Sequence, residues 1–515
     1  MTIISQPDIT LNIVAAQTEV QNTEQRVLFI AQKTSEGTAD SNELITDIQN
    51  NNSWDEMFGK RSMMAQGLRA ARTLNGIVTF DVIALDDPSE SGVAATATIT
   101  FEGTATASGK MKLSVSSEKN NTYTVTVAKG ETAGEIANKF VALLDMDDYV
   151  PVTAAHDNGT VTLTASNKGE EGNSTTLKFT GSAAGVTVTT TAFSGGAGTV
   201  TLPDLDTLID GQRYQTIVFP YSYGVGFVKD LLDVRFNTEN DVMDGLGITC
   251  SVDVWSNLKA AGDALNSKSL AILGERKVST NKLRGASIVE QPFVRSSQIA
   301  AIRSLRLTKD ADISQYVIGA GGPRDTFGGP AIASLPYFNT LIPTLVVPDI
   351  GTGFTSAQVK SLEDSGISVC GANRARNSVI MGEFVTTYET DNAGNPDVSF
   401  KYVNYVDTSS QAREYIWNNW KKAFAQSRLT TGDVLPNRNM HNANTIKDVT
   451  MGYYVVLSGN DYVLLQAGEQ ARAYFKANMS VQIDMAQGRV QMELKMPIVT
   501  QFRTLVATAQ LSFDV

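Results

Sequence analysis

The sequence predicts a multidomain α+β protein. It would have a mixed α/β middle domain, a β-rich C-terminal module with strand-exchanging termini, and an inserted all-β domain. Three observations predict this arrangement. Strand-like and helix-like segments alternate between residues 203 and 378. A stretch rich in Thr, Ser, Ala and Gly interrupts the chain from 88 to 199. The last third carries ribbons in which apolar and polar residues alternate. At 515 residues the chain is too long for one core and implies roughly three domains.

Residues 1–25 are predicted to form an N-terminal arm. Ile9, Leu11 and Ile13 alternate with polar residues, which is typical of a short strand, and the segment 17–25 is polar without a clear apolar face. A strand on a polar tether can pair within its own subunit or with a neighbouring one. The pattern alone leaves both possibilities open.

Residues 26–87 are predicted to form the first part of the α/β domain. The run Val27–Ile30 is typical of a buried strand, and Met63, Leu68 and Leu74 recur at helical spacing.

Residues 88–199 are predicted to form an inserted all-β surface domain, a sandwich or barrel. Its short alternating runs include Tyr123–Val127, and turn signals such as Asn158-Gly159 separate them. The capping box from Thr132 to Glu135 opens one helix. Because a domain entered and left near one edge of its host usually decorates the surface, we expect it to contact neighbouring subunits little.

Residues 200–378 are predicted to continue the α/β domain. Its strands begin with Thr216–Phe219, continue through Ile248–Val254 and Tyr316–Ile318, and end with Ile367–Cys370, with helices between them. This order implies a largely parallel or mixed sheet beneath helices.

Residues 379–498 are predicted to form the C-terminal β-rich module. The runs 379–388 and 398–406 flank a turn and predict a hairpin. Helices are predicted over about 409–427 and 463–477, and a second, half-buried hairpin follows them. The apolar residues of this second hairpin alternate with polar ones; they are Val481, Ile483, Met485, Val490, Met492 and Leu494.

Residues 499–515 are predicted to form a C-terminal arm. Pro497 ends the preceding hairpin pattern. After it, apolar and polar residues alternate again, as in a strand, and the apolar ones are Leu505, Ala507, Ala509, Leu511 and Phe513. A strand at the end of a chain must be paired, or it leaves an edge open to other chains. Such an edge can add to a neighbour's sheet by β-augmentation.

Composition argues against several function classes. The net charge of −12 argues against non-specific binding to nucleic acid, which needs a basic face. No apolar run approaches the roughly 20 residues of a membrane helix, so we expect no membrane insertion. Cys250 and Cys370 lie far apart and fit a reducing compartment. His156 and His441 lack a Cys or a second His at zinc-ligand spacing.

The sequence carries no recognisable catalytic constellation. The loop Gly319–Gly322 is the best candidate for a phosphate cradle, but Pro323 follows at once and no helix begins there. Asp145, Asp147 and Asp148 lack the Gly and terminal Glu of an EF-hand, so a solvated helix end explains them better. We therefore expect no enzyme, no cofactor and no metal.

The order of several segments carries a family resemblance. Phe58–Ser62 precedes an early helix, Gly130–Ala133 and Gly169–Asn173 lie in the insertion, and Phe384–Tyr388 and Gly394–Asp397 open the C-terminal module. In this order the chain resembles the contractile tail sheath proteins of Mu-like myophages, over most of its length.

The resemblance implies a structural subunit of the virion, assembled in the host cytoplasm. Its hexameric rings would stack helically around a tail tube and contract to drive the tube through the host envelope during genome ejection. Its partners would be further copies of itself, the tail tube protein, and baseplate and tail terminator proteins. The arms would add strands to neighbouring subunits, and the C-terminal module would form the inner layer. The polar residues Glu469, Arg472 and Lys476 of the helix 463–477 are our candidates for tube contact.

Three alternatives remain open. A sheath of a phage-tail-like bacteriocin or of a secretion system belongs to the same broad class. A tail tube or baseplate protein is a rival, although tube subunits are usually much shorter. An α/β hydrolase built on the middle domain is weakened by the missing catalytic residues.

Overall fold

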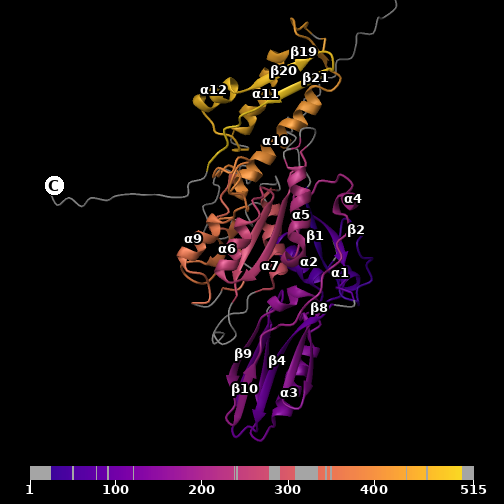
Figure 1. Ribbon diagram of the computed structural model, residues 1–515, viewed down its shortest axis with the longest axis vertical. Helices are drawn as coiled ribbons and strands as arrows, with labels where there is room; N and C mark the ends of the chain where they lie inside the picture. The colour runs from indigo at the N-terminus through magenta and orange to yellow at the C-terminus, as the bar shows by residue number, and fades with distance from the viewer. Residues whose placement is uncertain are drawn as a thin grey trace, which may run out of the picture.

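The computed structural model describes residues 25–48, 51–76, 78–89, 92–119, 121–236, 238, 242–277, 290–307, 334–342, 345–347, 351–436, 438–459 and 462–500. The predicted arm residues Ile9, Leu11 and Ile13 lie outside this part of the chain, and so does the predicted strand Tyr316–Ile318 with its glycine loop. The same holds for the C-terminal arm residues Leu505, Ala507, Ala509, Leu511 and Phe513. The described molecule is elongated, with the insertion at one end, an α/β body in the middle and the C-terminal module at the other end (Figure 1).

A seven-stranded sheet forms the centre of the body. Its strands, in spatial order, are β15 (Ile367–Ser368), β13 (Leu270–Arg276), β12 (Leu246–Asp253), β11 (Thr216–Val218), β1 (Arg26–Gln32), β3 (Thr79–Leu85) and β2 (Leu44–Ile45). All neighbours pair in parallel except β2, which runs antiparallel to β3. Parallel strands need helical crossovers, so their side chains are buried on both faces. The predicted alternation of strands and helices is confirmed as a mixed α/β body.

Helices cover both faces of this sheet. Val27 and Phe29 of β1 point into a core shared with α1 (Asn51–Phe58), α2 (Met63–Leu74) and α7 (Pro292–Leu307). Leu28 and Ile30 point to the other face, and the helices there are α4 (Leu205–Ile209), α5 (Tyr221–Arg235), α6 (Trp255–Asp263) and α9 (Ser356–Asp364). A small antiparallel sheet adjoins the body; its strands are β14 (Leu341–Ile342), β17 (Val379–Met381) and β16 (Cys370–Ala372).

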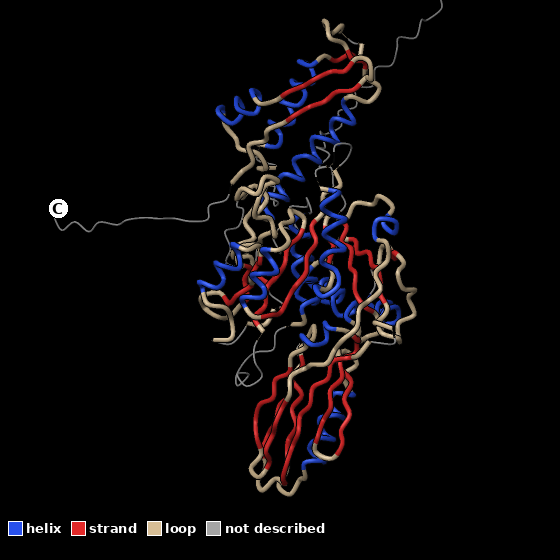
Figure 2. The backbone as a smooth tube through the Cα atoms, in the orientation of Figure 1, coloured by secondary structure: helices blue, strands red, loops and turns tan. Residues whose placement is uncertain are grey.

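The insertion consists of two antiparallel sheets and one α-helix around a core of its own (Figure 2). The first sheet contains β10 (Val186–Thr190), β4 (Ala94–Gly103), β8 (Thr160–Lys168) and β7 (Val152–Asp157). The second contains β6 (Thr122–Val127), β5 (Gly109–Val115) and β9 (Leu177–Ser182). A 3-10 turn, η1, covers Glu170–Ser174. The helix, α3 (Ala133–Asp145), begins at the predicted capping box, in which Thr132 and Glu135 bond reciprocally.

The C-terminal module differs from the β-rich module that the sequence predicts, because more of its described residues lie in helices than in strands. Its elements are α10 (Val403–Ala423), β18 (Arg428–Leu429), β19 (Met440–His441), α11 (Ala443–Leu457), α12 (Glu469–Ala477), β20 (Ser480–Asp484) and β21 (Arg489–Glu493). The hairpin predicted at 379–388 and 398–406 is wrong as two regular strands. Only the bridges Val385↔Tyr402 and Thr390↔Pro396 form beyond β17, and α10 already begins at Val403.

Both cysteines are free thiols. Cys250 is buried on β12, and the Cys370 thiol lies 3.7 Å from the Met381 sulfur. Burial raises the pKa of the Cys370 thiol to about 12, so it stays protonated at neutral pH. None of the helices within the described ranges combines the length and hydropathy that a membrane span requires.

Candidate functional site

The closing hairpin presents a partly open apolar face. Strands β20 and β21 pair antiparallel, with Val481 opposite Met492 and Ile483 opposite Val490, so the predicted antiparallel hairpin forms. Val481, Ile483, Met492 and Leu494 are half-buried, whereas Met485 and Val490 are exposed. The sheet has only these two strands among the described residues, so each has one outer edge without a ladder partner there. An isolated two-stranded ribbon is marginally stable unless something packs on it.

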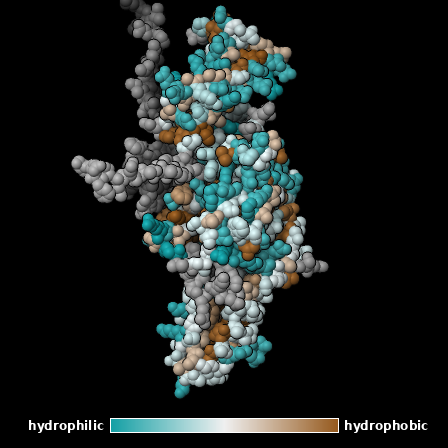
Figure 3. Space-filling view, turned by 60° about the vertical axis from the view of Figure 1, so that its left-hand side comes forward, coloured by the Kyte–Doolittle hydropathy of each residue, from teal (hydrophilic) through white to brown (hydrophobic). Residues whose placement is uncertain are grey.

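Part of that hairpin rests on the core of the module. The buried side chains of this core include Tyr454 of α11 and Phe475 of α12, whose rings stack with centroids 4.7 Å apart. Several large apolar side chains of the module remain exposed; they are Val455, Val456, Val463, Tyr474, Met485 and Val490. Figure 3 shows the apolar residues of one face as separate small patches among hydrophilic ones, with some of them on this module.

The three residues predicted to contact a tube lie on one short exposed helix. Helix α12 starts at Glu469, six residues later than the predicted start at about 463. Glu469, Arg472 and Lys476 are all exposed, and their spacing of three and four residues places them on one side of the helix. Phe475 faces the core of the module instead. The helix lies at the end of the molecule farthest from the insertion (Figure 1).

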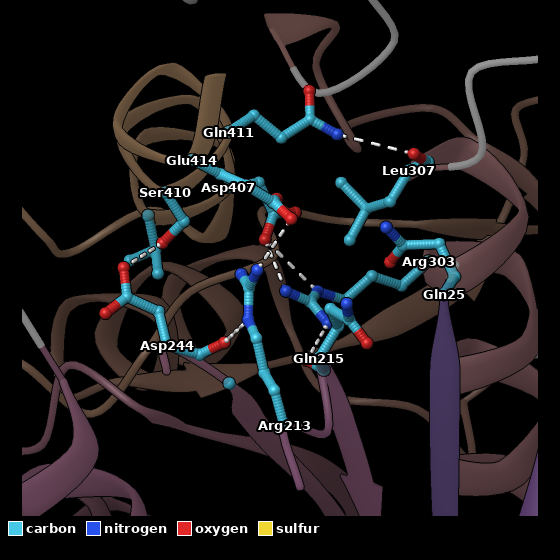
Figure 4. Close-up of a pocket in the computed structure, with 12 residues that line it drawn as sticks. Gln25, Arg213, Gln215, Asp244, Arg303, Leu307, Asp407, Ser410, Gln411 and Glu414 are labelled. Atoms are coloured by element: carbon cyan, nitrogen blue, oxygen red, sulfur yellow. Dashed lines mark hydrogen bonds and ion pairs between the residues drawn. The ribbon is translucent and has the colours of Figure 1, made fainter. Parts of the chain in front are cut away.

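A buried network of charged side chains fastens α10 to the body. The guanidinium of Arg303, on α7, donates to Asp407 of α10, with 2.5 Å between Nη2 and Oδ1. Arg303 also donates to the Gln215 carbonyl and the Thr216 hydroxyl, at 2.6 Å each. The Tyr337 hydroxyl donates to the other oxygen of Asp407 at 2.8 Å. Figure 4 shows Arg303 and Gln215 close to Asp407 of α10, although the three residues come from separate parts of the chain.

Further polar contacts extend this network along α10. Arg213 pairs with Glu414 at 3.0 Å. Asp244, which is buried, accepts from the Ser410 hydroxyl and from Arg413, at 2.6 Å each. The helix therefore meets the body through alternating acidic and basic groups over more than two turns.

Burial makes this network costly to disrupt. The side chains of Arg303 and Asp407 are 5% and 0% exposed. Burial, reinforced by the Asp407 carboxylate, raises the pKa of the Tyr337 phenol, so it stays a hydrogen-bond donor at neutral pH. Burial lowers the pKa of the nearby Arg306 guanidinium, which lies 4.0 Å from the Tyr337 ring centroid. A charge left unpaired in such a site costs several kcal/mol, on the order of 3–5 kcal/mol.

Two of the acidic residues that were considered as a weak calcium site, Asp147 and Asp148, form contacts within the protein. Asp147 accepts from the Asn121 amide, the Tyr123 hydroxyl and the Tyr149 backbone N–H. Asp148 pairs with Lys60 of the body at 2.8 Å. Within the described ranges no group of His, Cys, Asp and Glu is arranged to hold a metal ion.

Comparison with known proteins identifies one curated relative. The chain is 23% identical over 414 residues to the Mu-like prophage FluMu tail sheath protein of Haemophilus influenzae, and the match covers 78% of this chain and 76% of that protein. The chain is related to a tail sheath protein. The resemblance expected from the sequence is thereby confirmed. No protein-family model matches the chain.

Several solved structures of tail proteins are also similar. The sheath tail protein of Listeria innocua is 14% identical, with a TM-score of 0.45 over 93% of this chain and 92% of that one. The sheath tail protein of Desulfitobacterium hafniense is 12% identical, with a TM-score of 0.47 over 93% and 94% of the two chains. The helical sheath of the anti-feeding prophage is 11% identical, with a TM-score of 0.44 over 99% of both. These TM-scores lie below 0.5, so the relation to tail sheath proteins rests on the sequence similarity to the Haemophilus influenzae protein.

The relative is named as a tail sheath protein and not as an enzyme, which agrees with the expectation from the sequence.

Proposed function

We propose that this chain is the subunit of a contractile tail sheath. It polymerises as stacked hexameric rings around a tail tube and shortens to drive the tube through the host envelope. The observation that carries the proposal is the relation to a Mu-like prophage tail sheath protein over 78% of the chain. The open-edged hairpin β20–β21 supports it, because a polymer needs a surface that is completed by a neighbour.

Strand donation is the proposed link between subunits. The segments 1–25 and 499–515 would add strands beside β20 and β21 of neighbouring subunits. The half-buried residues of the hairpin, such as Ile483 and Met492, offer apolar area that an added strand would cover. Its free backbone groups would supply the hydrogen bonds of the new ladder.

The domain layout suggests which parts face inward. We propose that the C-terminal module, 379–498, forms the inner layer, that the body of 26–87 and 200–378 lies outside it, and that the insertion 88–199 forms the outer surface. The module and the insertion lie at opposite ends of the elongated molecule, which supports an arrangement along the radius (Figure 1).

Contraction needs a difference in contact energy between two states. Donated strands near the axis would persist as hinges, while the larger body surfaces re-pack at a new radius. The buried pair Arg303–Asp407 would keep α10 fixed to the body, so that the movement of the body reaches the inner layer.

The particle can be a virion or a related machine. In a virion the partners are a tail tube protein, baseplate proteins and a tail terminator, and assembly takes place in the host cytoplasm. A bacteriocin or secretion-system sheath would use the same subunit in the same way.

Electron microscopy of the purified protein tests the proposal. In negative stain we expect long hollow tubes with a regular helical repeat. Discrete particles at every concentration and salt condition would instead favour a tube, baseplate or enzyme role.

Charge reversal on α12 tests the proposed tube contact. We expect the double variant Arg472→Glu/Lys476→Glu to assemble on purified tubes at least about tenfold less well at low salt, since it replaces attraction by repulsion. The control Lys259→Glu/Lys360→Glu makes the same charge change on α6 and α9 of the body. Co-sedimentation with tubes measures both. Equal sedimentation of the two variants would contradict the contact, and so would a density map with α12 far from the lumen.

A further inference from the structure

The outer face of the sheet β6–β5–β9 is cationic and rich in hydroxyl groups. The inward residues of β5 are Met111, Leu113 and Val115, which are buried in the insertion core. The outward residues form rows across the sheet, in which Lys110 lies beside Thr126 and Ser182, Lys112 beside Thr124 and Thr180, and Ser114 beside Thr122 and Lys178. No acidic residue occupies these positions. We call this surface the lysine face, and its residues, apart from the buried Ser114, are Lys110, Lys112, Thr122, Thr124, Thr126, Lys178, Thr180 and Ser182.

Within the described chain, Lys110, Lys112 and Lys178 form no ion pair, although other lysines nearby do. Lys139, on α3, pairs with Glu131 at 2.5 Å. Lys60 of the body pairs with Asp148 of the insertion. Lys110 and Lys112 are neighbours on β5, about 7 Å apart, and Lys178 lies diagonally next to Lys112, at about 7–8 Å. The face therefore offers three ammonium groups in a row to an anionic partner.

The insertion is also held at a fixed angle to the body. Arg69 of α2 donates from Nε to both oxygens of Glu118, at 2.8 and 2.9 Å, and the Glu118 side chain is only 4% exposed. Asn167 accepts from the Met63 backbone N–H at 2.8 Å and donates to the Lys33 carbonyl at 2.9 Å.

A second group of contacts also fixes the insertion to the body. Asp87 accepts from Gln32 and Asn167 at 2.7 and 2.8 Å. Glu171 accepts from the Ser222 N–H at the start of α5, at 2.8 Å. Burial raises the pKa of both carboxyl groups, which is the cost of placing them in the junction. A loosely tethered surface domain has no need of these buried contacts, whereas a docking surface needs a defined position.

An acidic counterpart exists on the body of the same chain. The loop between β1 and β2 exposes Glu36, Asp40 and Glu43, and within the described residues none of the three forms an ion pair. The chain as a whole carries a net charge of −12, so further copies are an abundant source of negative charge. In Figure 1, β9 and β2 lie on opposite sides of the long axis. A contact between two different patches of the same subunit is heterologous, and it builds rings or helices rather than closed dimers.

We propose that the lysine face docks on the acidic loop 36–43 of a second copy of this chain. This contact deepens the proposed sheath function and rests on it. It also gives the insertion a part in assembly, in place of the small role that composition alone suggests. Because the contact is between exposed charges, it would weaken as the ionic strength rises.

A charge swap tests the docking. The variant Lys110→Glu/Lys112→Glu/Lys178→Glu should fold with the wild-type circular dichroism spectrum but need about tenfold more protein to form tubes at low salt. The variant Glu36→Lys/Asp40→Lys/Glu43→Lys should show a similar defect. Combining the two sets on one chain should restore tube formation, because every contact then has both signs exchanged.

The controls separate this proposal from the sheath function itself. The variant Lys259→Glu/Lys277→Glu/Lys360→Glu carries the same charge change on the body, away from the lysine face, and should form tubes like the wild type. If the wild type forms no tubes, the sheath function fails. If it does, and the lysine-face variant assembles equally well or the combined variant is not restored, the docking is overturned. Normal assembly of the lysine-face variant with lost heparin binding would assign the face to an external polyanion and also overturn it.

Discussion

Replacing Asp407 with alanine is expected to lower the free energy of unfolding by about 3–5 kcal/mol. The substitution would leave the Arg303 guanidinium buried without its carboxylate, and the Tyr337 hydroxyl would lose its acceptor. Because Asp407 lies in the first turns of α10, the helix should also detach from α7. The midpoint of urea unfolding of the unassembled protein, followed by circular dichroism, measures the loss.

A surface pair provides the matched control. Lys259 and Asp263 lie at 2.6 Å on α6, with side chains 38% and 41% exposed. Removing the carboxylate with Asp263→Ala should cost less than about 1 kcal/mol, since solvent screens the pair. If Asp407→Ala costs no more than this control, the α10 junction does not depend on the buried pair. Loss of tubes without loss of stability would likewise argue against the anchoring role.

The sequence predicted the mixed α/β character of the body and several of its strands, although not β2 or β3. A strand that is buried on both faces appears in the sequence as a short continuous apolar run. Val27–Ile30 and Leu270–Leu273 are such runs, and they lie in β1 and β13. Helix α3 was predictable from its capping box, because both of its reciprocal bonds depend on local residue types. These signals span only a few residues, so no tertiary information is needed to see them.

Helix α11 was not predicted from the sequence, because several of its residues favour other structures. Gly452 stands in its interior and weakens helix propensity by about 1 kcal/mol, and the pair Val455-Val456 favours a strand. Its capping box uses Asn442 and Thr445, in place of the usual acidic residue at the second position. Packing of Tyr454 and Leu457 against the module core then overrides the weak local preference.

The network at α10 could not be predicted because its partners are far apart in the chain. Arg303 and Asp407 are separated by 104 residues, and neither belongs to a recognisable motif. Helix α7 is buried on all sides, including its arginines. Arginine is a residue that is almost never fully buried unless it is paired, and only the tertiary arrangement brings carboxylates to these side chains.

Deleting residues 503–515 is expected to abolish tube formation while leaving a folded, soluble subunit. The described core of the C-terminal module is complete without these residues, since Tyr454, Phe475 and Leu465 pack among residues that precede them. In the proposed assembly the segment covers the hairpin of a neighbour, and without it each subunit loses one of its two donated strands and leaves that hairpin incompletely covered. Negative-stain images measure tube formation, and circular dichroism of the deletion variant measures folding.

A pair of substitution variants separates strand donation from mere chain length. Leu511→Lys/Phe513→Lys places charges on the apolar side of the predicted strand, where a neighbour's hairpin would bury them, so it should prevent tubes as the deletion does. Gln510→Lys/Ser512→Lys adds the same charge to the alternate, polar side and should leave tubes intact, because side chains alternate between the two faces of a strand. Tubes from all variants would show that the C-terminal segment is not the link between subunits. Loss of tubes in both substitution variants would mean that added charge, rather than the buried side of a donated strand, controls assembly.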